Sequence, residues 1–203
     1  MLATPTAKPF SKAGWLFELK YDGFRVLAIK QGKQTQLLSR RGRDMAKSFP
    51  ELVKAMQDLP DVVIDGEMVV LNDLGAPQFE RLRWRALMSI HKEVTHAAAK
   101  EPAAIFAFDL LSLDGEDTRK WPLLERKSAL SEALPRRSRI QYASHVEDRG
   151  EEFYAQVSKM HLEGMVAKDA ASRYVAGRSR HWLKVKTPAG QAIEDERLRH
   201  LRE

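Results

Sequence analysis

The chain has 203 residues, of which 43% are hydrophobic, enough for one domain with a proper core or at most two small lobes. It contains no cysteine, which excludes disulfides, thiolate zinc sites and cysteine nucleophiles. No apolar run approaches the ~20 residues of a membrane span, and residues 1–14 lack the apolar core of a signal peptide, so we expect a soluble intracellular protein. The net charge of +6 favours a polyanionic partner.

The first half of the chain predicts mostly strands. Residues 1–13 are expected to form an extended lead-in. Proline in a first turn predicts a helix starting at Ser48-Phe49-Pro50, and a second helix is expected from about 77 to 88. Short apolar runs bounded by glycine, aspartate or asparagine predict strands at 15–19, 24–30, 35–39, 62–64 and 67–71.

The second half mixes both kinds of element. A strand is predicted at 105–113, ending at Asp114-Gly115, and the polar segment 188–203 is expected to be a tail with a short exposed helix. Because many neighbouring strands are separated only by turns, the pattern favours an α+β fold with antiparallel β-sheets flanked by helices. The remaining elements are helices at 122–134 and 151–161 and strands at 165–168 and 182–186.

Lys20 lies between an apolar run and the tight turn Asp22-Gly23. An amine at a strand end beside a rigid turn can be desolvated and aimed, as a covalent nucleophile requires. The alternative is that Lys20 is an ordinary surface residue, because Asp-Gly between apolar runs is a common signal for a β-hairpin.

Lys184 and Lys186 alternate with Leu183 and Val185 near the end of the chain. Period two places both amines on one face of a strand and the apolar side chains on the other. A phosphate-binding pair and a solvated strand face both fit this pattern.

Two further segments carry charge or aromatic groups among apolar residues. Asp65-Gly66-Glu67 is enclosed by β-branched residues, which suits either a hairpin turn or a pair of functional acids. Phe106 and Phe108 alternate along a strand, where core packing is the ordinary role.

Six segments together resemble the signature of covalent nucleotidyltransferases. The chain is most similar to the adenylation domain of ATP-dependent DNA ligases, and in particular to the ligase domain of the bacterial ligase D family. The resemblance implies a covalent nucleotidyltransferase (ATP-grasp-like) adenylation domain over residues 14–187. The segments are Glu18-Leu19-Lys20-Tyr21-Asp22-Gly23-Phe24-Arg25, Ser39-Arg40-Arg41-Gly42, Asp65-Gly66-Glu67, Phe106-Ala107-Phe108-Asp109-Leu110-Leu111, Glu163-Gly164-Met165-Val166-Ala167-Lys168 and Trp182-Leu183-Lys184-Val185-Lys186.

The resemblance implies that Lys20 attacks the α-phosphate of ATP and becomes a lysyl-adenylate. Attack needs a neutral amine, and cations at Lys184 and Lys186 would favour loss of its proton and bind the α-phosphate. Magnesium is the expected metal, with manganese as a substitute, because the chain offers carboxylates and no thiols. For the metal and the nucleoside, the resemblance implies metal binding by Glu163 and Glu67, ribose contact by Glu67, adenine stacking by Phe108, and contact with the adenine edge by the side chain or backbone of Glu18. For the phosphates, it implies binding by Arg25 and Arg40, with Arg40 meeting the nick. Asp22 is expected to act in a later step on DNA.

The implied function is sealing of nicked or broken duplex DNA in bacterial repair and end joining, in the cytoplasm at the nucleoid. Arg173, Arg178 and Arg180 could add contacts to backbone phosphates, although a solvated loop is equally compatible. Two alternatives stay open: another covalent nucleotidyltransferase of the RNA ligase or capping type, and a catalytically weak DNA- or nucleotide-binding remnant.

Ligases of this kind carry an OB-fold domain after the adenylation domain. The sequence ends about seventeen residues after Lys186, so we expect no such domain here. Self-adenylation and tight DNA binding should then depend on a partner that supplies the OB-fold function. Sealing of a pre-adenylated nick should be affected less.

Overall fold

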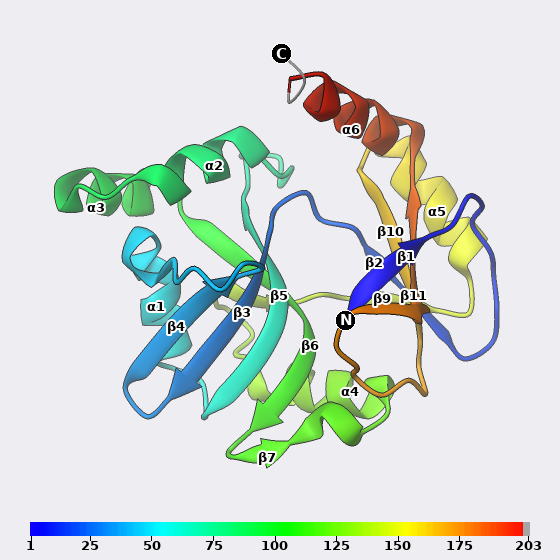
Figure 1. Cartoon of the computed structure of the whole chain (residues 1–203), viewed down its shortest axis with the longest axis horizontal. Helices are drawn as coiled ribbons and strands as arrows, with labels where there is room; N and C mark the ends of the chain where they lie inside the picture. The colour runs from blue at the N-terminus through cyan, green and yellow to red at the C-terminus, as the bar shows by residue number, and fades with distance from the viewer. Residues whose placement is uncertain (201–203) are drawn as a thin grey trace. The chain divides into compact units, whose positions relative to one another are not determined.

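The computed structural model describes residues 1–200, without the side chains at positions 198 and 200, so residues 201–203 of the expected tail lie outside it. The chain forms two compact units (Figure 1). Unit 1 contains Met1–Tyr21 and the segment from Ser144 onward, and unit 2 is the continuous segment Asp22–Ala143. None of the helices in the described part is long and apolar enough to cross a membrane.

Unit 1 is built on one five-stranded sheet in the order β1-β11-β10-β2-β9. Its neighbouring strands are antiparallel except β1 and β11, which are parallel. Phe17, Met165, Ala167 and Val185 form its apolar core. The strands are β1 (Leu2–Pro5), β2 (Trp15–Leu19), β9 (His145–Glu147), β10 (Gly164–Asp169) and β11 (Arg178–Lys186).

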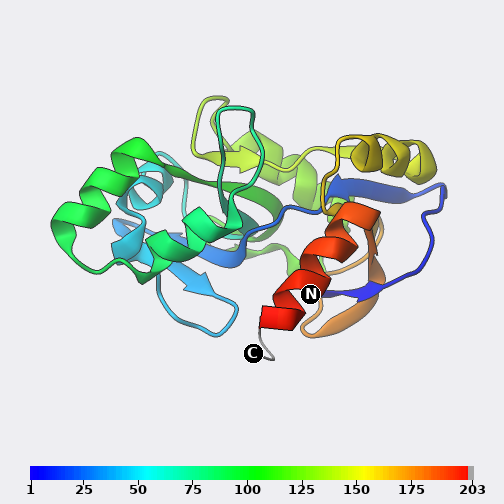
Figure 2. The ribbon, with the colours of Figure 1, turned by 90° about the horizontal axis from the view of Figure 1, so that it is seen from above.

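Two helices accompany this sheet. Helix α5 (Gly150–Lys159) packs against β10 and β2, and helix α6 (Pro188–His200) continues from β11 and contacts it (Figure 2). The predicted helix in the C-terminal tail is therefore confirmed, but it is not fully exposed, because Gly190 in its first turn is buried against the Glu163 backbone. The expected lead-in is more than a linker, because Leu2–Pro5 adds a strand to the sheet and Met1 is buried.

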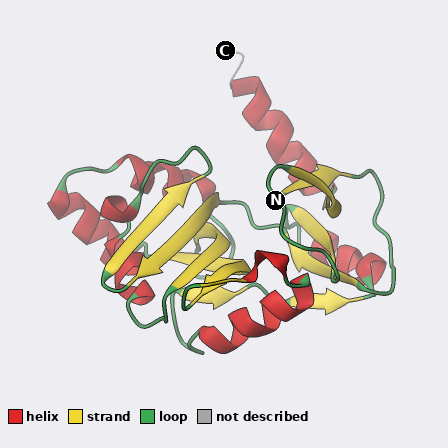
Figure 3. Ribbon diagram, turned by 60° about the horizontal axis from the view of Figure 1, so that its bottom comes forward, coloured by secondary structure: helices red, strands yellow, loops and turns green. Residues whose placement is uncertain are grey.

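Unit 2 is built on a second sheet in the order β4-β3-β5-β6-β7, with β8 parallel to β6 (Figure 3). The core of unit 2 lies where α1, α2 and α4 pack against the strands. The strands are β3 (Phe24–Gln31), β4 (Gln34–Ser39), β5 (Val62–Val70), β6 (Ala103–Leu113), β7 (Glu116–Asp117) and β8 (Ile140–Tyr142). The helices are η1 (Ala46–Ser48), α1 (Pro50–Met56), α2 (Phe79–Leu87), α3 (His91–Lys100), η2 (Thr118–Lys120) and α4 (Leu123–Ala133).

A buried ion pair joins helix α4 to strand β6. Arg126 donates through Nε and one terminal nitrogen to the two carboxylate oxygens of Asp109, at 2.6 and 2.9 Å. Both side chains are fully buried, and Arg126 also donates to the Trp121 carbonyl at 2.6 Å. Asp109 directly follows Phe108, so this ion pair holds the backbone of β6 in place next to the ring that is predicted to stack on adenine.

Two turns expected from Asp-Gly pairs are wrong. Asp65-Gly66 lies inside the continuous strand β5, where a side chain on Gly66 would come within 2.9 Å of the Phe106 carbonyl oxygen. Asp22-Gly23 does not close a hairpin, because β2 pairs with β9 and β10 while β3 pairs with β4 and β5. The sequence patterns did not predict helix α3 or strands β8 and β9.

Candidate active site

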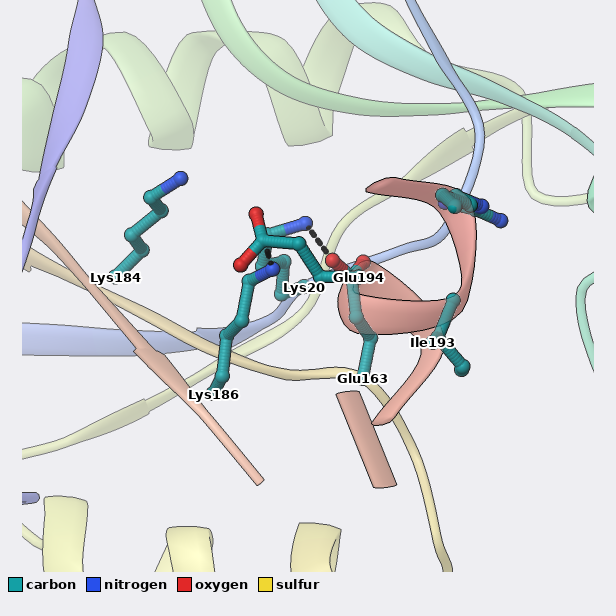
Figure 4. Close-up of a pocket in the computed structure, with 7 residues that line it drawn as sticks. Lys20, Glu163, Lys184, Lys186, Ile193 and Glu194 are labelled. Carbon is teal, nitrogen blue, oxygen red and sulfur yellow. Dashed lines mark hydrogen bonds and ion pairs between the residues drawn. The ribbon is translucent and has the colours of Figure 1, made fainter. Parts of the chain in front are cut away.

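Lys20 is the first residue after strand β2, and the sheet of unit 1 fixes its backbone. Its amide donates to the Gly164 carbonyl at 2.9 Å, continuing the pairing of β2 with β10. The Lys20 amine forms a hydrogen-bonded ion pair with Glu163 Oε1 (Figure 4). The two predicted site residues, which are 143 positions apart in the chain, are thus in direct contact.

Glu163 lies just before β10, and its two carboxylate oxygens differ. Oε1 contacts the Lys20 amine, whereas Oε2 is buried and has no hydrogen-bond partner among the described residues. An unpaired buried carboxylate oxygen is costly, so this atom is suited to an additional ligand. Sequence reasoning identified the residue but not this division of its oxygens.

Lys184 and Lys186 reach the same place from β11. They pair across the sheet with Val166 and Gly164, and both line one pocket with Lys20 and Glu163. The alternation in the sequence therefore places both amines on one face, as predicted. Burial, followed by the positive charges of Lys20 and Lys186, lowers the pKa of Lys184 below its ordinary value.

The pocket within unit 1 is small. Its volume is about 160 Å³, and its walls include Lys20, Glu163, Lys184 and Lys186. Ligand sites for whole drug-sized molecules usually measure some 300–1,000 Å³. Unit 1 alone therefore offers room for a phosphate group and water, and the described lining has four cationic and two acidic side chains.

Helix α6 contributes a carboxylate that the sequence did not reveal. Glu194 Oε1 lies 2.7 Å from the Lys186 amine, and Ile193 and Arg197 also line the pocket. The hydrogen bond from Lys186, with the charges of Lys184 and Lys20, lowers the pKa of Glu194. A polar tail carries no periodic signal that distinguishes Glu194 from its neighbours, so only the fold identifies it.

Glu18 is engaged inside unit 1. Its carboxylate accepts a hydrogen bond from the Lys168 amine at 2.6 Å, and both side chains are almost fully buried. The same amine lies 4.1 Å from the centre of the Trp182 ring. Because the Glu18 side chain is committed to Lys168, its backbone is the better candidate for contact with an adenine edge.

Tyr21, next to Lys20, is affected by the same acid. Burial, and then the charge of Glu18, raises the pKa of Tyr21 from 10.0 to about 12. Its phenol is therefore uncharged near neutral pH.

Unit 2 holds the remaining candidates, and three of them share the β3-β5-β6 region. Arg25 makes a bidentate ion pair with buried Asp65, at 2.9 and 2.5 Å, and its guanidinium lies 5.6 Å from the centre of the Phe108 ring. Glu67 pairs across the sheet with both Arg25 and Phe106. Asp65, for which the sequence pattern suggested a turn, instead lies in β5 and orients Arg25.

The last two candidates lie at the ends of elements in unit 2. Arg40 is exposed directly after β4, and Asp22 opens unit 2 just before β3. An exposed arginine at a strand end can reach a phosphate.

A protein-only metal cage is not present in the described residues, where no three histidine, cysteine or acidic groups gather closely enough to hold an ion. Magnesium does not require such a cage, because it commonly binds one or two carboxylates, substrate phosphates and water. The unpaired Oε2 of Glu163 fits this mode of binding.

Comparison with known proteins identifies the family of the chain. The family model described as "ATP dependent DNA ligase domain" matches residues 1–186. The chain is 34% identical over 181 residues to a DNA ligase of Thermococcus fumicolans, covering 84% of this chain and 32% of that protein. It is also 34% identical over 195 residues to DNA ligase C1 of Mycolicibacterium smegmatis, covering 92% of this chain and 55% of the relative.

A solved structure of mycobacterial DNA ligase D complexed with ATP and MES superimposes with a TM-score of 0.73 at 30% identity. The match covers 91% of this chain and 58% of that one. The chain therefore belongs to the ATP-dependent DNA ligase domain family, which confirms the resemblance and the α+β adenylation-domain fold. It spans about a third to a little over half of the length of these relatives.

Proposed function

We propose that the chain is the catalytic domain of an ATP-dependent DNA ligase, with Lys20 as the residue that becomes adenylated. The observation that carries the proposal is the pocket in which the Lys20 amine meets Glu163, Lys184 and Lys186. A nucleophilic amine beside an acid and two further cations is what phosphoryl-group attack by lysine requires.

In the proposed reaction, Lys20 Nζ attacks the α-phosphorus of ATP. A nitrogen–phosphorus bond forms, the bond from the α-phosphorus to the bridging oxygen breaks, and pyrophosphate leaves. Before attack the ammonium gives up one proton to the Glu163 carboxylate, which it already contacts. The attacking nitrogen then carries two protons, of which one passes to the departing pyrophosphate and the other stays on the neutral phosphoramidate nitrogen.

Lys184 and Lys186 would bind the charge that grows on the phosphate oxygens. Because the lowered pKa of Lys184 reflects burial beside two other cations, an incoming phosphate would relieve their mutual repulsion. Magnesium, or manganese in its place, would be held by Glu163 Oε2 and by the nucleotide's own phosphates, and would supply charge neutralisation.

The nucleoside would be recognised by unit 2. We assign adenine stacking to Phe108, ribose or metal contact to Glu67, and phosphate contacts to Arg25 and Arg40. The fixed Arg25–Asp65 pair supports the assignment of Arg25, because a guanidinium held by a buried acid keeps its remaining donors in place.

Transfer of the adenylate to nicked or broken DNA at the bacterial nucleoid, with a role for Asp22, is the activity that we propose for the whole enzyme. Any protein partner in that reaction is part of the same proposal. It rests on family membership and on the exposed arginines of the β10–β11 region.

The decisive experiment is incubation with α-labelled ATP and magnesium, followed by denaturing electrophoresis. Label should appear on the wild type and on Lys33→Ala, an exposed lysine in a turn of unit 2, and should be absent from Lys20→Ala. Label that persists on Lys20→Ala would refute the assignment of the nucleophile. Preferential labelling by GTP would instead indicate a capping-type enzyme.

A second measurement is needed if the wild-type protein takes no label from ATP. Sealing of a pre-adenylated nicked duplex bypasses the first step, so activity there would keep the ligase assignment and remove only self-adenylation. Binding of DNA without sealing would favour the alternative of a catalytically weak binding module.

A further inference from the structure

Helix α6 brings an acid into a cluster of cations. In Figure 4 the Glu194 carboxylate lies among the amines of Lys20, Lys184 and Lys186. Its hydrogen-bonded ion pair with Lys186 spans 2.7 Å. The Lys186 side chain is 15% exposed and that of Glu194 is 44% exposed, so the acid reaches into the pocket from its open side.

The start of α6 is held in place by contacts with the segment before β10, and these contacts position Glu194 at the pocket. Thr187, which precedes the helix, donates its hydroxyl to the Leu162 carbonyl at 2.5 Å and its amide to the Glu163 carbonyl at 3.1 Å. Gly190 packs so closely that a Cβ there would lie 1.9 Å from the Glu163 carbonyl oxygen. The first turn of α6 is therefore fixed against the backbone of Glu163, and Glu194 follows one turn later.

A carboxylate on Lys186 occupies the interaction that a phosphate oxygen would use. Both anions accept charge-assisted hydrogen bonds from an ammonium group, and the Glu194 carboxylate takes one of the three donors of Lys186 and repels a phosphate that enters the same pocket. The more exposed partner of the pair is the acid, which can turn into water without leaving a buried charge unpaired.

We propose that Glu194 is an internal competitor for the phosphate-binding lysines, an autoinhibitory carboxylate that polyphosphate must displace from Lys186. The inference rests on the proposed function, since it takes Lys184 and Lys186 to be the phosphate-binding groups. It adds that the C-terminal helix weakens nucleotide binding until a phosphate replaces its acid.

The test compares Glu194→Gln with Glu196→Gln in the full chain. Both variants lose one negative charge from α6, but Glu196 is exposed and makes no ion pair with the described residues. Inorganic pyrophosphate is titrated into each protein by calorimetry, which involves no covalent step. Because a partly exposed ion pair contributes about 0.2–1 kcal/mol, Glu194→Gln should bind pyrophosphate about 1.4- to fivefold more tightly than Glu196→Gln.

A double-mutant cycle locates the effect on the right amine. In a Lys186→Met background, replacement of Glu194 should no longer tighten pyrophosphate binding. Equal or weaker binding by Glu194→Gln, a gain that survives in Lys186→Met, or no pyrophosphate binding by any variant would each overturn the inference.

The two proposals fail separately. Tighter pyrophosphate binding by Glu194→Gln without any Lys20 adenylate would leave this inference standing and remove the proposed reaction. Normal adenylation of Lys20 with identical pyrophosphate binding by the two glutamine variants would do the reverse.

Discussion

At the Lys20 amine, the requirements of the resting protein and of the reaction are opposed. Glu163 stabilises a charged amine, whereas attack on phosphorus needs a lone pair. The proposed mechanism resolves this conflict by giving Glu163 two tasks. One oxygen takes the proton and the other, which has no hydrogen-bond partner among the described residues, faces the incoming ligand.

Tyr21 allows a pH prediction at the neighbouring position. A folded-state pKa of about 12 lies above the ordinary value of 10.0, so the neutral phenol stabilises the fold fully below pH 10. This contribution should be lost as the pH rises from 10 to about 12. Titration followed by tyrosinate absorbance should therefore show a late step from Tyr21.

Replacement by phenylalanine identifies that tyrosine. The late step should disappear in Tyr21→Phe and persist in Tyr174→Phe. Ionisation of all four tyrosines near the ordinary value would contradict the role assigned to burial and to Glu18.

At the scale of elements, sequence patterns predicted most helices and strands and missed what depends on distant neighbours. Asp65-Gly66 has the local signature of a turn, yet it lies in mid-strand. Arg25 neutralises the aspartate, and β6 leaves no room for a side chain on the glycine. Both causes come from residues about 40 positions away, which no local pattern contains.

The link between α4 and β6 supports a stability prediction. Arg126→Met removes one partner of a fully buried pair and leaves Asp109 charged in the core, which should cost about 3–5 kcal/mol in the free energy of unfolding. Denaturant unfolding of the full chain measures this loss.

An exposed pair of the same chemistry serves as the control. Arg119 makes the same bidentate contact with Asp117, with both of its distances at 2.8 Å, but the two side chains are about half exposed. Arg119→Met should therefore change stability far less than Arg126→Met, because water screens the pair. Equal losses in the two variants would contradict the energetic role of burial.

At the scale of the whole molecule, charge connects the chain to its proposed substrate. Arg173, Arg178 and Arg180 are exposed in and before the first part of β11, and the net charge is +6. If each contacts one phosphate, replacing all three with glutamine should lower the slope of log affinity against log salt by up to about 2.7. Fluorescence anisotropy with nicked duplex DNA over a salt series measures this slope.

The control removes the same charge elsewhere. Lys54, Lys92 and Lys159 are exposed lysines on three helices, and their triple glutamine variant should keep most of the salt dependence. Equal slopes for the two triple variants would show that only net charge matters.

The site residues that could be predicted from the sequence are those that lie in the segments that resemble the nucleotidyltransferase signature. Lys20, Glu163, Lys184 and Lys186 were identified in this way, and the structure brings them together in unit 1. Glu194, Lys168 and Thr187 were not identified. Each acts through one particular contact, with Lys186, Glu18 and the Leu162–Glu163 backbone respectively, and such contacts exist only after folding.

The route of the chain has a consequence for synthesis on the ribosome. Lys20 is made before unit 2, but its sheet partners and the other lining residues of its pocket come only after the whole of unit 2. On the proposed function, a nascent chain that stops before Lys186 carries the nucleophile without all of the lysines proposed to bind its phosphate. The sheet of unit 1 can thus close only after unit 2 has been made, so the proposed chemistry of Lys20 has to wait for β10 and β11.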